Sequence, residues 1–159
     1  MTLTRNRSPK LIALMEKAAE FHGHLGPFLA IGVRMGVIGL ERLGNPAYNS
    51  LAITASLPIK VPFSCIIDGL QVSTNCTVGN QKLSLRDSPT IQVKFQREDN
   101  KQEILLTLNR SMFEKIKSQL LTKSMPNDEV RKLAWMIVEL SEDELFEIAS
   151  DESSCAHNF

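Results

Sequence analysis

The stretch Phe21-His22-Gly23-His24-Leu25-Gly26-Pro27-Phe28 separates two apolar segments of the chain. Gly23 allows backbone conformations that a side chain would forbid, so a helix can end there. Pro27 suits the first turn of a new helix, where its missing N–H has no partner to lose. Two of the three histidines of the chain lie in this corner. The stretch therefore predicts a helix–corner–helix unit that aims two imidazoles where a regular helix could not.

Both sides of the corner are predicted to be helical. Residues 11–21 carry apolar side chains on a broad stripe, which is typical of an amphipathic helix. Residues 28–43 are apolar nearly all round, so this second helix should be central. We expect another backbone to pack very close to one of its faces, in the same subunit or in a partner, because three glycines share that face: Gly32, Gly36 and Gly39.

The rest of the chain predicts a sheet followed by helices. Alternation of apolar and polar residues indicates strands over residues 51–57, 83–86, 90–97 and 103–109, and a short helix is expected over residues 65–72. The last third predicts helices over residues 113–121, 126–140 and 145–149. Capping boxes that begin at Ser111 and Ser141 open the first and third of these. The fold class is therefore α+β, with N-terminal helices, an antiparallel meander sheet and C-terminal helices.

Length and composition predict how the chain is organised. The 159 residues, 43% hydrophobic and 23% charged, are typical of a soluble globular protein that can bury a core. We expect an α+β core over residues 1–110, a helical extension over residues 111–150 packed on that core, and a flexible tail over residues 151–159.

Charge and cysteine usage exclude several classes of partner. The net charge is zero, which gives no electrostatic reason to expect nucleic acid or a membrane surface as a partner. The longest apolar stretch, residues 28–40, is too short to span a bilayer and carries Arg34 at its middle. Three cysteines without CxxC spacing, and an N-terminus without the apolar run of a signal peptide, predict a reducing, cytoplasmic location.

The histidine pair is the first candidate site. His22 and His24 offer neutral imidazole nitrogens, which are good ligands for Zn, Ni, Cu or Fe. The ordinary alternative is a pair of solvent-facing or capping histidines at a helix junction. The glycines and the proline around the pair make the two interpretations about equal.

Cys65 and Asp68 lie on one face of the predicted short helix. Partial positive charge at the helix N-terminus should lower the pKa of the Cys65 thiol, and a thiolate is a soft-metal ligand or a nucleophile. Its commoner role is that of a buried small hydrophobe. Asp68 could orient an imidazole from behind. From the sequence alone, compensation of the helix dipole is the favoured role for Asp68.

Cys76 raises a problem of distance. If residues 65–72 are helical, the sulfurs of Cys65 and Cys76 are on the order of 10–15 Å apart. Ligands of one tetrahedral ion lie only about 4 Å apart. Cys76 can therefore join the site only if the loop folds back or if it comes from a partner subunit. Cys155 and His157 resemble a ligand pair but fall in the predicted tail.

Two segments in this order resemble the FmdE family of proteins, which is named after formylmethanofuran dehydrogenase, over roughly residues 11–110. The first is the corner, residues 21–28. The second is Cys65-Ile66-Ile67-Asp68-Gly69-Leu70-Gln71, followed by Thr74-Asn75-Cys76-Thr77-Val78-Gly79. The family pattern reads approximately Phe-His-Gly-His-Leu-Cys-Pro-Gly, then Cys-x-x-Asp-x-x-Gln, then Thr-Gly-Cys-Thr-x-Gly.

The five candidate site residues match this pattern: His22, His24, Cys65, Asp68 and Cys76. The sequence departs from it at Gly26, where many members have cysteine, at Phe28 and at Asn75, where they have glycine. The absence of a cysteine at position 26 removes one thiolate ligand and weakens any case for cysteine-dependent redox chemistry.

The resemblance implies a divalent metal, with zinc expected, held by His22, His24, Cys65 and Cys76, with Asp68 behind the ligands. It implies an intertwined homodimer, and a core-type member without a C-terminal zinc finger, since no CxxC pairs follow the core. The function implied is an accessory or catalytic metalloprotein of formylmethanofuran or one-carbon metabolism in an archaeon or anaerobe, with a larger one-carbon enzyme complex as a further partner. The alternative is a non-enzymatic metal-sensing or protein-interaction module. An open coordination position would favour the enzyme, and a closed four-ligand site the sensor.

Overall fold

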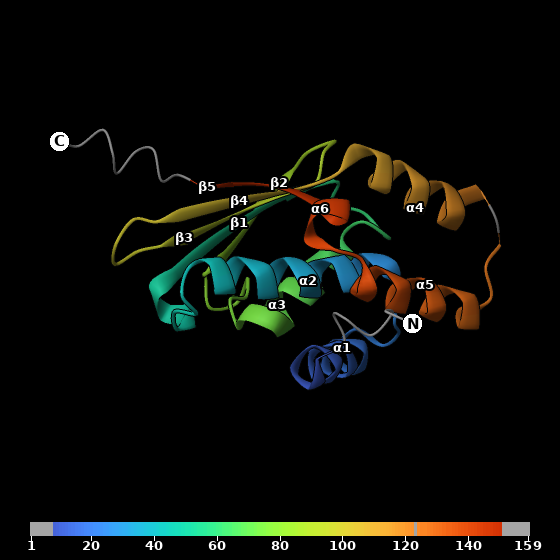
Figure 1. The fold of residues 1–159 in the computed structure, drawn as a ribbon, viewed down its shortest axis with the longest axis horizontal. Coiled ribbons are helices and arrows are strands. Elements are labelled where there is room, and N and C mark those ends of the chain that lie inside the picture. Colours follow the sequence, from blue (N-terminus) through green and yellow to red (C-terminus); the bar gives the residue numbers. More distant parts are fainter. Residues whose placement is uncertain (1–7, 123, 151–159) are drawn as a thin grey trace.

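The computed structural model describes residues 8–122 and 124–150. The helices are α1 (Pro9–His22), α2 (Pro27–Arg42), α3 (Cys65–Thr74), α4 (Arg110–Thr122), α5 (Asn127–Glu139) and α6 (Glu142–Leu145), with a 3-10 turn η1 (Tyr48–Ser50). The strands are β1 (Leu51–Leu57), β2 (Leu83–Asp87), β3 (Gln92–Arg97), β4 (Glu103–Leu108) and β5 (Phe146–Ser150). Figure 1 gives their arrangement, and the predicted α+β class is confirmed.

The strands form one five-stranded sheet in the order β2-β1-β3-β4-β5. The pairs β1–β3, β3–β4 and β4–β5 are antiparallel. Strand β2 departs from the predicted antiparallel meander, because it pairs parallel to β1. Helix α3 lies between these two strands in the chain and carries it back to the end of the sheet where β1 starts, as a parallel pair requires.

Residues 146–150 are a strand, so the helix predicted over residues 145–149 is wrong. The capping box at Ser141 is present, with Ser141 and Glu144 exchanging side-chain and backbone hydrogen bonds, but the helix that it opens, α6, is a single turn. Beyond it, Phe146 and Ile148 alternate along the chain and lie opposite Leu108 and Leu106 of β4. The open edge of β4 supplies backbone partners that a short isolated helix would lack.

Helix α4 begins at Arg110, earlier than predicted. The backbone N–H of Phe113 donates to the carbonyl of Asn109 at 2.9 Å, so Ser111 lies inside the first turn. The capping box predicted at Ser111 is therefore wrong. Helix α5, in contrast, has nearly the predicted bounds.

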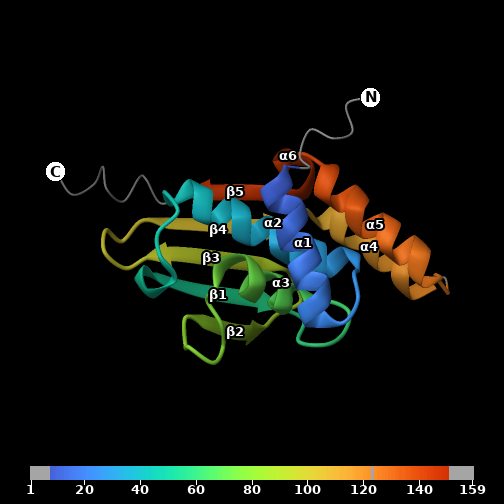
Figure 2. The ribbon, with the colours of Figure 1, turned by 90° about the horizontal axis from the view of Figure 1, so that it is seen from below.

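Helices α2 and α3 cover one face of the sheet, and α1 crosses them on the side away from it (Figure 2). Helix α2 is central as predicted, with 12 of its 16 residues buried. Its glycine face packs closely: a Cβ built on Gly32 would collide with the carbonyl of Ile66, and one built on Gly36 with the Ser73 hydroxyl. The close backbone predicted for this face is α3 of the same subunit.

Two further glycines, Gly69 and Gly39, also allow close packing around α2. Gly69 of α3 approaches the backbone of α2 so closely that a Cβ there would collide with the carbonyl of Leu29. Gly39 lies against β3, where a Cβ would come within 2.6 Å of the Phe95 ring. Glycines on both helices thus allow α2 and α3 to approach backbone to backbone.

Arg34 fixes the C-terminal half of the chain to α2. Its side chain is 5% exposed, and Nη1 donates to the carbonyls of Ile137, Val138 and Leu140 at 3.1, 2.8 and 2.8 Å. These carbonyls lie at the end of α5, where a helix leaves its last carbonyl groups without partners. Burial lowers the pKa of Arg34, and nearby carboxylates oppose that effect. Arg34, a cation within the apolar helix α2, therefore caps the C-terminal end of α5.

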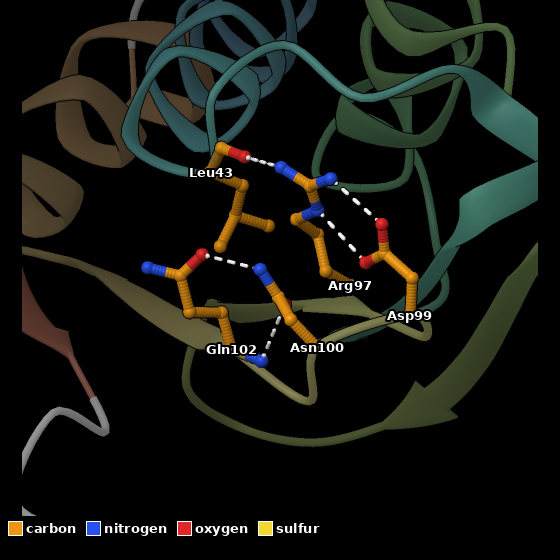
Figure 3. A network of polar contacts seen from close by, with 5 residues as sticks. All are labelled: Leu43, Arg97, Asp99, Asn100 and Gln102. Atoms are coloured by element: carbon orange, nitrogen blue, oxygen red, sulfur yellow. Dashed lines mark hydrogen bonds and ion pairs between the residues drawn. The ribbon is translucent and has the colours of Figure 1, made fainter. Parts of the chain in front are cut away.

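The far end of α2 is held by the hairpin between β3 and β4 (Figure 3). Arg97 donates to the carbonyl of Leu43 at 2.7 Å and pairs with both oxygens of Asp99 at 2.9 and 2.7 Å. In the same turn, the Asn100 side chain accepts from the backbone of Gln102 at 3.0 Å and donates to its side chain at 3.1 Å. The hairpin is thereby tied to the helix layer.

Two predictions are not decided by the fold. The division at residue 110 stays a prediction. The predicted tail, residues 151–159 with Cys155 and His157, lies outside the described residues. Over residues 8–122 and 124–150, none of the helices has both the length and the apolar character needed to cross a membrane.

Candidate functional site

The corner between α1 and α2 has the predicted form. Gly23 adopts a φ of 101° in the left-handed region, and its N–H donates to the carbonyl of Ala19 at 2.8 Å, which ends α1 at His22. Leu25 is 3% exposed and anchors the corner in the core. Pro27 is then the first residue of α2. The corner is a rigid connection that presents its two histidines beside the start of α3.

Asp68 orients His22. The side chain of Asp68 is 31% exposed and that of His22 is 15% exposed. Nδ1 of His22 lies 2.6 Å from Oδ2 of Asp68. The other carboxylate oxygen accepts from the Gln71 amide at 3.4 Å, and Gln71 accepts in turn from the backbone N–H of Val78 at 3.0 Å. This chain of contacts leaves Nε2 of His22 facing away from the carboxylate. The sequence favoured dipole compensation for Asp68 and gave no role to Gln71.

His24 lies next to His22, with the two ring centroids 4.8 Å apart and the planes tilted by 40°. Desolvation by neighbouring side chains lowers the pKa of His24, and the nearby ring of His22 lowers it further. Both effects favour the neutral imidazole, which is the form that binds a metal.

Cys65 is the first residue of α3 and is 7% exposed. Burial raises the pKa of its thiol, the carboxylate of Asp68 raises it further, and the backbone hydrogen bond at the helix start only partly opposes them. The expectation of a thiolate stabilised by the helix N-terminus is therefore not met, because desolvation outweighs the helix dipole. A metal that binds here has to displace the thiol proton.

Cys76 lies at the opposite end of α3. Cys65 is the first of the ten residues of α3, which at about 1.5 Å of rise per residue is about 15 Å long, and Cys76 follows two residues after its end. Its side chain is fully buried, its Sγ is 3.8 Å from the carbonyl of Tyr48, and burial raises the pKa of the thiol. Among the described residues, Cys76 joins no group of three or more potential metal ligands.

The structure explains why the sequence has Asn75 where the family pattern has glycine. Asn75 caps the end of α3 with a φ of 63°, in the left-handed region. Asparagine tolerates this conformation better than most residues that carry a side chain, so it can stand where the family pattern has glycine. Within the described part of the chain, no three His, Cys, Asp or Glu side chains are positioned to hold a metal ion together.

A pocket of about 370 Å³ opens beside His24 and Cys65. Its walls come from the start of α2, the loop at Val61 and Pro62, the end of α4 and the start of α5. The sequence did not predict the walls from α4 and α5. No local pattern could have shown them, since they are brought to the corner by the packing of α5 on α2 and the Arg34 contacts.

The fold has helices on one face of a sheet, and the site has a carboxylate-oriented histidine at a helix corner. Together they define a class of α+β proteins with a histidine site at a helix corner. The sequence model described as "FmdE, Molybdenum formylmethanofuran dehydrogenase operon" matches residues 21–148, most of the chain. The chain belongs to the FmdE family.

One solved structure and one further protein are similar to this chain. A protein of Syntrophus aciditrophicus, described as similar to the FmdE protein of tungsten formylmethanofuran dehydrogenase, has a similar fold with a TM-score of 0.58 at 19% identity, over 88% of this chain and 71% of the other. A probable S-adenosyl-L-methionine-binding protein of Archaeoglobus fulgidus is 43% identical over 83 residues. That match covers 52% of this chain but only 23% of the archaeal protein.

Proposed function

We propose that this chain is a metal-binding FmdE-family protein that serves formylmethanofuran or one-carbon metabolism as an accessory or catalytic metalloprotein. The observation that carries the proposal is the 2.6 Å contact between His22 and Asp68. Histidines that bind metals are commonly held by a carboxylate on their other ring nitrogen, which fixes the ring and raises its basicity. Membership of the family supports the metabolic link.

The donor set fits a transition ion better than a hard cation. His22 would bind through Nε2 because Asp68 occupies Nδ1. The ring of His24 lies next to it, and the thiol of Cys65 lines the same pocket as His24. Imidazole and thiolate suit zinc, nickel or copper rather than magnesium or calcium. When bound, such an ion can act as a Lewis acid or activate a water. Asp68 would hold the His22 ring, and Cys65 would give up its proton to the solvent on binding.

We expect the two cysteines to contribute unequally to metal binding. In native mass spectrometry of protein purified without chelator, the wild type should carry one divalent ion per subunit, and Cys65→Ser should lose most of it. Cys76→Ser is the matched control, since its thiol is also buried, at 0% exposure against 7% for Cys65, but lies beyond the far end of α3. Full metal in Cys65→Ser would refute the ligand set.

The same spectra give the subunit count, which tests the homodimer that we include in the proposal. If Cys76→Ser loses the ion as completely as Cys65→Ser, and the protein is dimeric, then Cys76 is supplied by the partner subunit. Gly26→Cys tests the site in the opposite direction. A Cβ at position 26 would lie 3.6 Å from Nε2 of His24 with ordinary contacts elsewhere, so the added thiol should tighten zinc binding, whereas Gly26→Ser should not.

Metal affinity should rise with pH. The pKa of His24 is lowered, so its ring is already neutral near neutral pH, whereas the pKa of Cys65 is raised and its thiol still carries a proton. Binding must release that proton, so the apparent zinc affinity should fall by about tenfold per unit as pH decreases below the thiol pKa, and more steeply once the imidazoles protonate. A competition titration with a zinc chelator at several pH values measures the slope. A flat profile would exclude Cys65 as a ligand.

The name of the archaeal relative raises S-adenosylmethionine as a ligand, but we do not extend it to this chain. The match covers under a quarter of that protein, and no described residue that lines the pocket beside Cys65 is an Asp, Glu, Lys or Arg that would pair with the amino-acid end of the molecule. The cytoplasm remains the compartment that we propose, on the grounds of cysteine usage.

A further inference from the structure

The pocket beside the histidine corner is apolar over most of its lining. Phe28 and Leu29 of α2, each 1% exposed, and the nearly buried Cys65 line it. At its rim, Val61 and Leu121 are 79% and 56% exposed. Large apolar side chains that remain this exposed around a hollow indicate that something apolar covers or enters it.

The polar groups of the pocket are few. His24 comes from the corner, Cys65 is the first residue of α3, and Asn127 is the first residue of α5. Among the described lining residues there is no Asp, Glu, Lys or Arg. A ligand with a permanent charge would therefore lose its hydration without gaining an ionic partner in the lining, which is costly. A ligand with one polar end and an apolar body would lose little favourable hydration on entering the pocket.

We propose that this pocket binds an uncharged, mainly apolar small molecule, whose polar end meets His24 and Cys65 and whose body lies between α2, α4 and α5. The volume of about 370 Å³ lies within the range of small-molecule sites, and the pocket is bounded by five separate segments of the chain. The role of this molecule as a substrate rests on the proposed function, because it would sit against the proposed metal ligands. Its binding does not.

Two dyes that share one scaffold test the proposal. N-Phenyl-1-naphthylamine is uncharged, and 8-anilinonaphthalene-1-sulfonate is the same ring system with a sulfonate. The uncharged dye should bind the full chain saturably at one site per subunit, as followed by its fluorescence. The sulfonate should bind at least about tenfold more weakly. Equal binding of the two dyes would overturn the assignment of an uncharged ligand.

A pair of tryptophan variants on α5 locates the dye. The Val130 side chain faces position 26 across the pocket, with Cγ1 3.5 Å from a Cβ built there, so Val130→Trp should fill the space and weaken binding of the uncharged dye at least about tenfold. Met136 is on the same helix and is 47% exposed, so Met136→Trp should leave the affinity for the uncharged dye unchanged. Gly26→Leu fills the pocket from the opposite wall and serves if Val130→Trp does not fold.

Other outcomes also decide the matter. Unchanged dye affinity in both filling variants would place the dye elsewhere and overturn the proposal. The absence of dye binding would overturn it as well. In that case, a conversion from dimer to monomer in Val130→Trp would identify the pocket as a contact between two copies of the chain. Metal content measured on the same samples separates the two proposals: Val130→Trp should lose the dye and keep the ion, whereas failure of the dye with a full complement of metal in the wild type leaves the proposed function standing.

Discussion

Gly36→Leu should lower the free energy of unfolding by about 3 kcal/mol or more. A Cβ at this position would already collide with the Ser73 hydroxyl and lie 2.8 Å from its Cβ and 3.0 Å from Cγ2 of Thr74. Ser73 cannot simply turn away, because its hydroxyl donates to the carbonyl of Gly69 at 2.8 Å. Helices α2 and α3 would have to separate to admit the side chain. Urea unfolding followed by circular dichroism measures the loss.

The control for this variant is Gly79→Leu. Gly79 is exposed, and a Cβ there would meet nothing closer than Thr77 Oγ1 at 3.7 Å. Its unfolding midpoint should stay close to that of the wild type. If Gly36→Leu melts with the wild type as well, α2 and α3 are not packed backbone to backbone. A partial recovery in Gly36→Ala with Ser73→Ala, relative to Gly36→Ala alone, would identify the hydroxyl as the source of the strain.

Arg34→Met is expected to destabilise the protein by about 3 kcal/mol or more. Methionine can fill much of the same space, but it removes the buried guanidinium that donates to the carbonyls of Ile137, Val138 and Leu140 at the end of α5. Loss of this cap should also loosen the segment that follows, so proteolysis of the native protein should cut near α6 and β5 sooner than in the wild type.

Arg42→Met is the matched comparison on the same helix. Arg42 pairs with Glu142 at 2.6 Å, but both side chains are well exposed, at 46% and 37%. A surface ion pair contributes at most about 1 kcal/mol. A loss in Arg42→Met as large as that in Arg34→Met would mean that the contact between α2 and the C-terminal segment depends on surface charge rather than on the buried cap.

The sequence predicts well what depends on neighbours in the chain. The corner follows from Gly23 and Pro27, which impose backbone conformation locally, and the close helix contact follows from glycines repeated on one face of α2. The short helix predicted over residues 65–72 is present as α3, with Cys65 at its start and Cys76 beyond its end. These features are local, so a single sequence carries them.

What the sequence does not predict depends on distant partners. Residues 146–150 follow a good capping box, yet they form a strand because β4 offers a free edge. Asp68 meets His22 only because α3 packs across the end of α1, 46 residues away in sequence. The state of the Cys65 thiol depends on how far the chain buries it, which outweighs the helix dipole that the sequence suggests. Burial of this kind is a property of the whole fold.

Strand β5 also has a consequence for synthesis of the protein. The partner of β4 on that side comes from the last described segment, beyond α4, α5 and α6. Until the ribosome has released residues 146–150, the nascent sheet ends at β4, with a row of unpaired backbone donors and acceptors along its edge. Such an edge can recruit a strand from another chain. The Arg34 cap then has a second effect, since by fixing the end of α5 it holds the closing strand near the edge that it must cover.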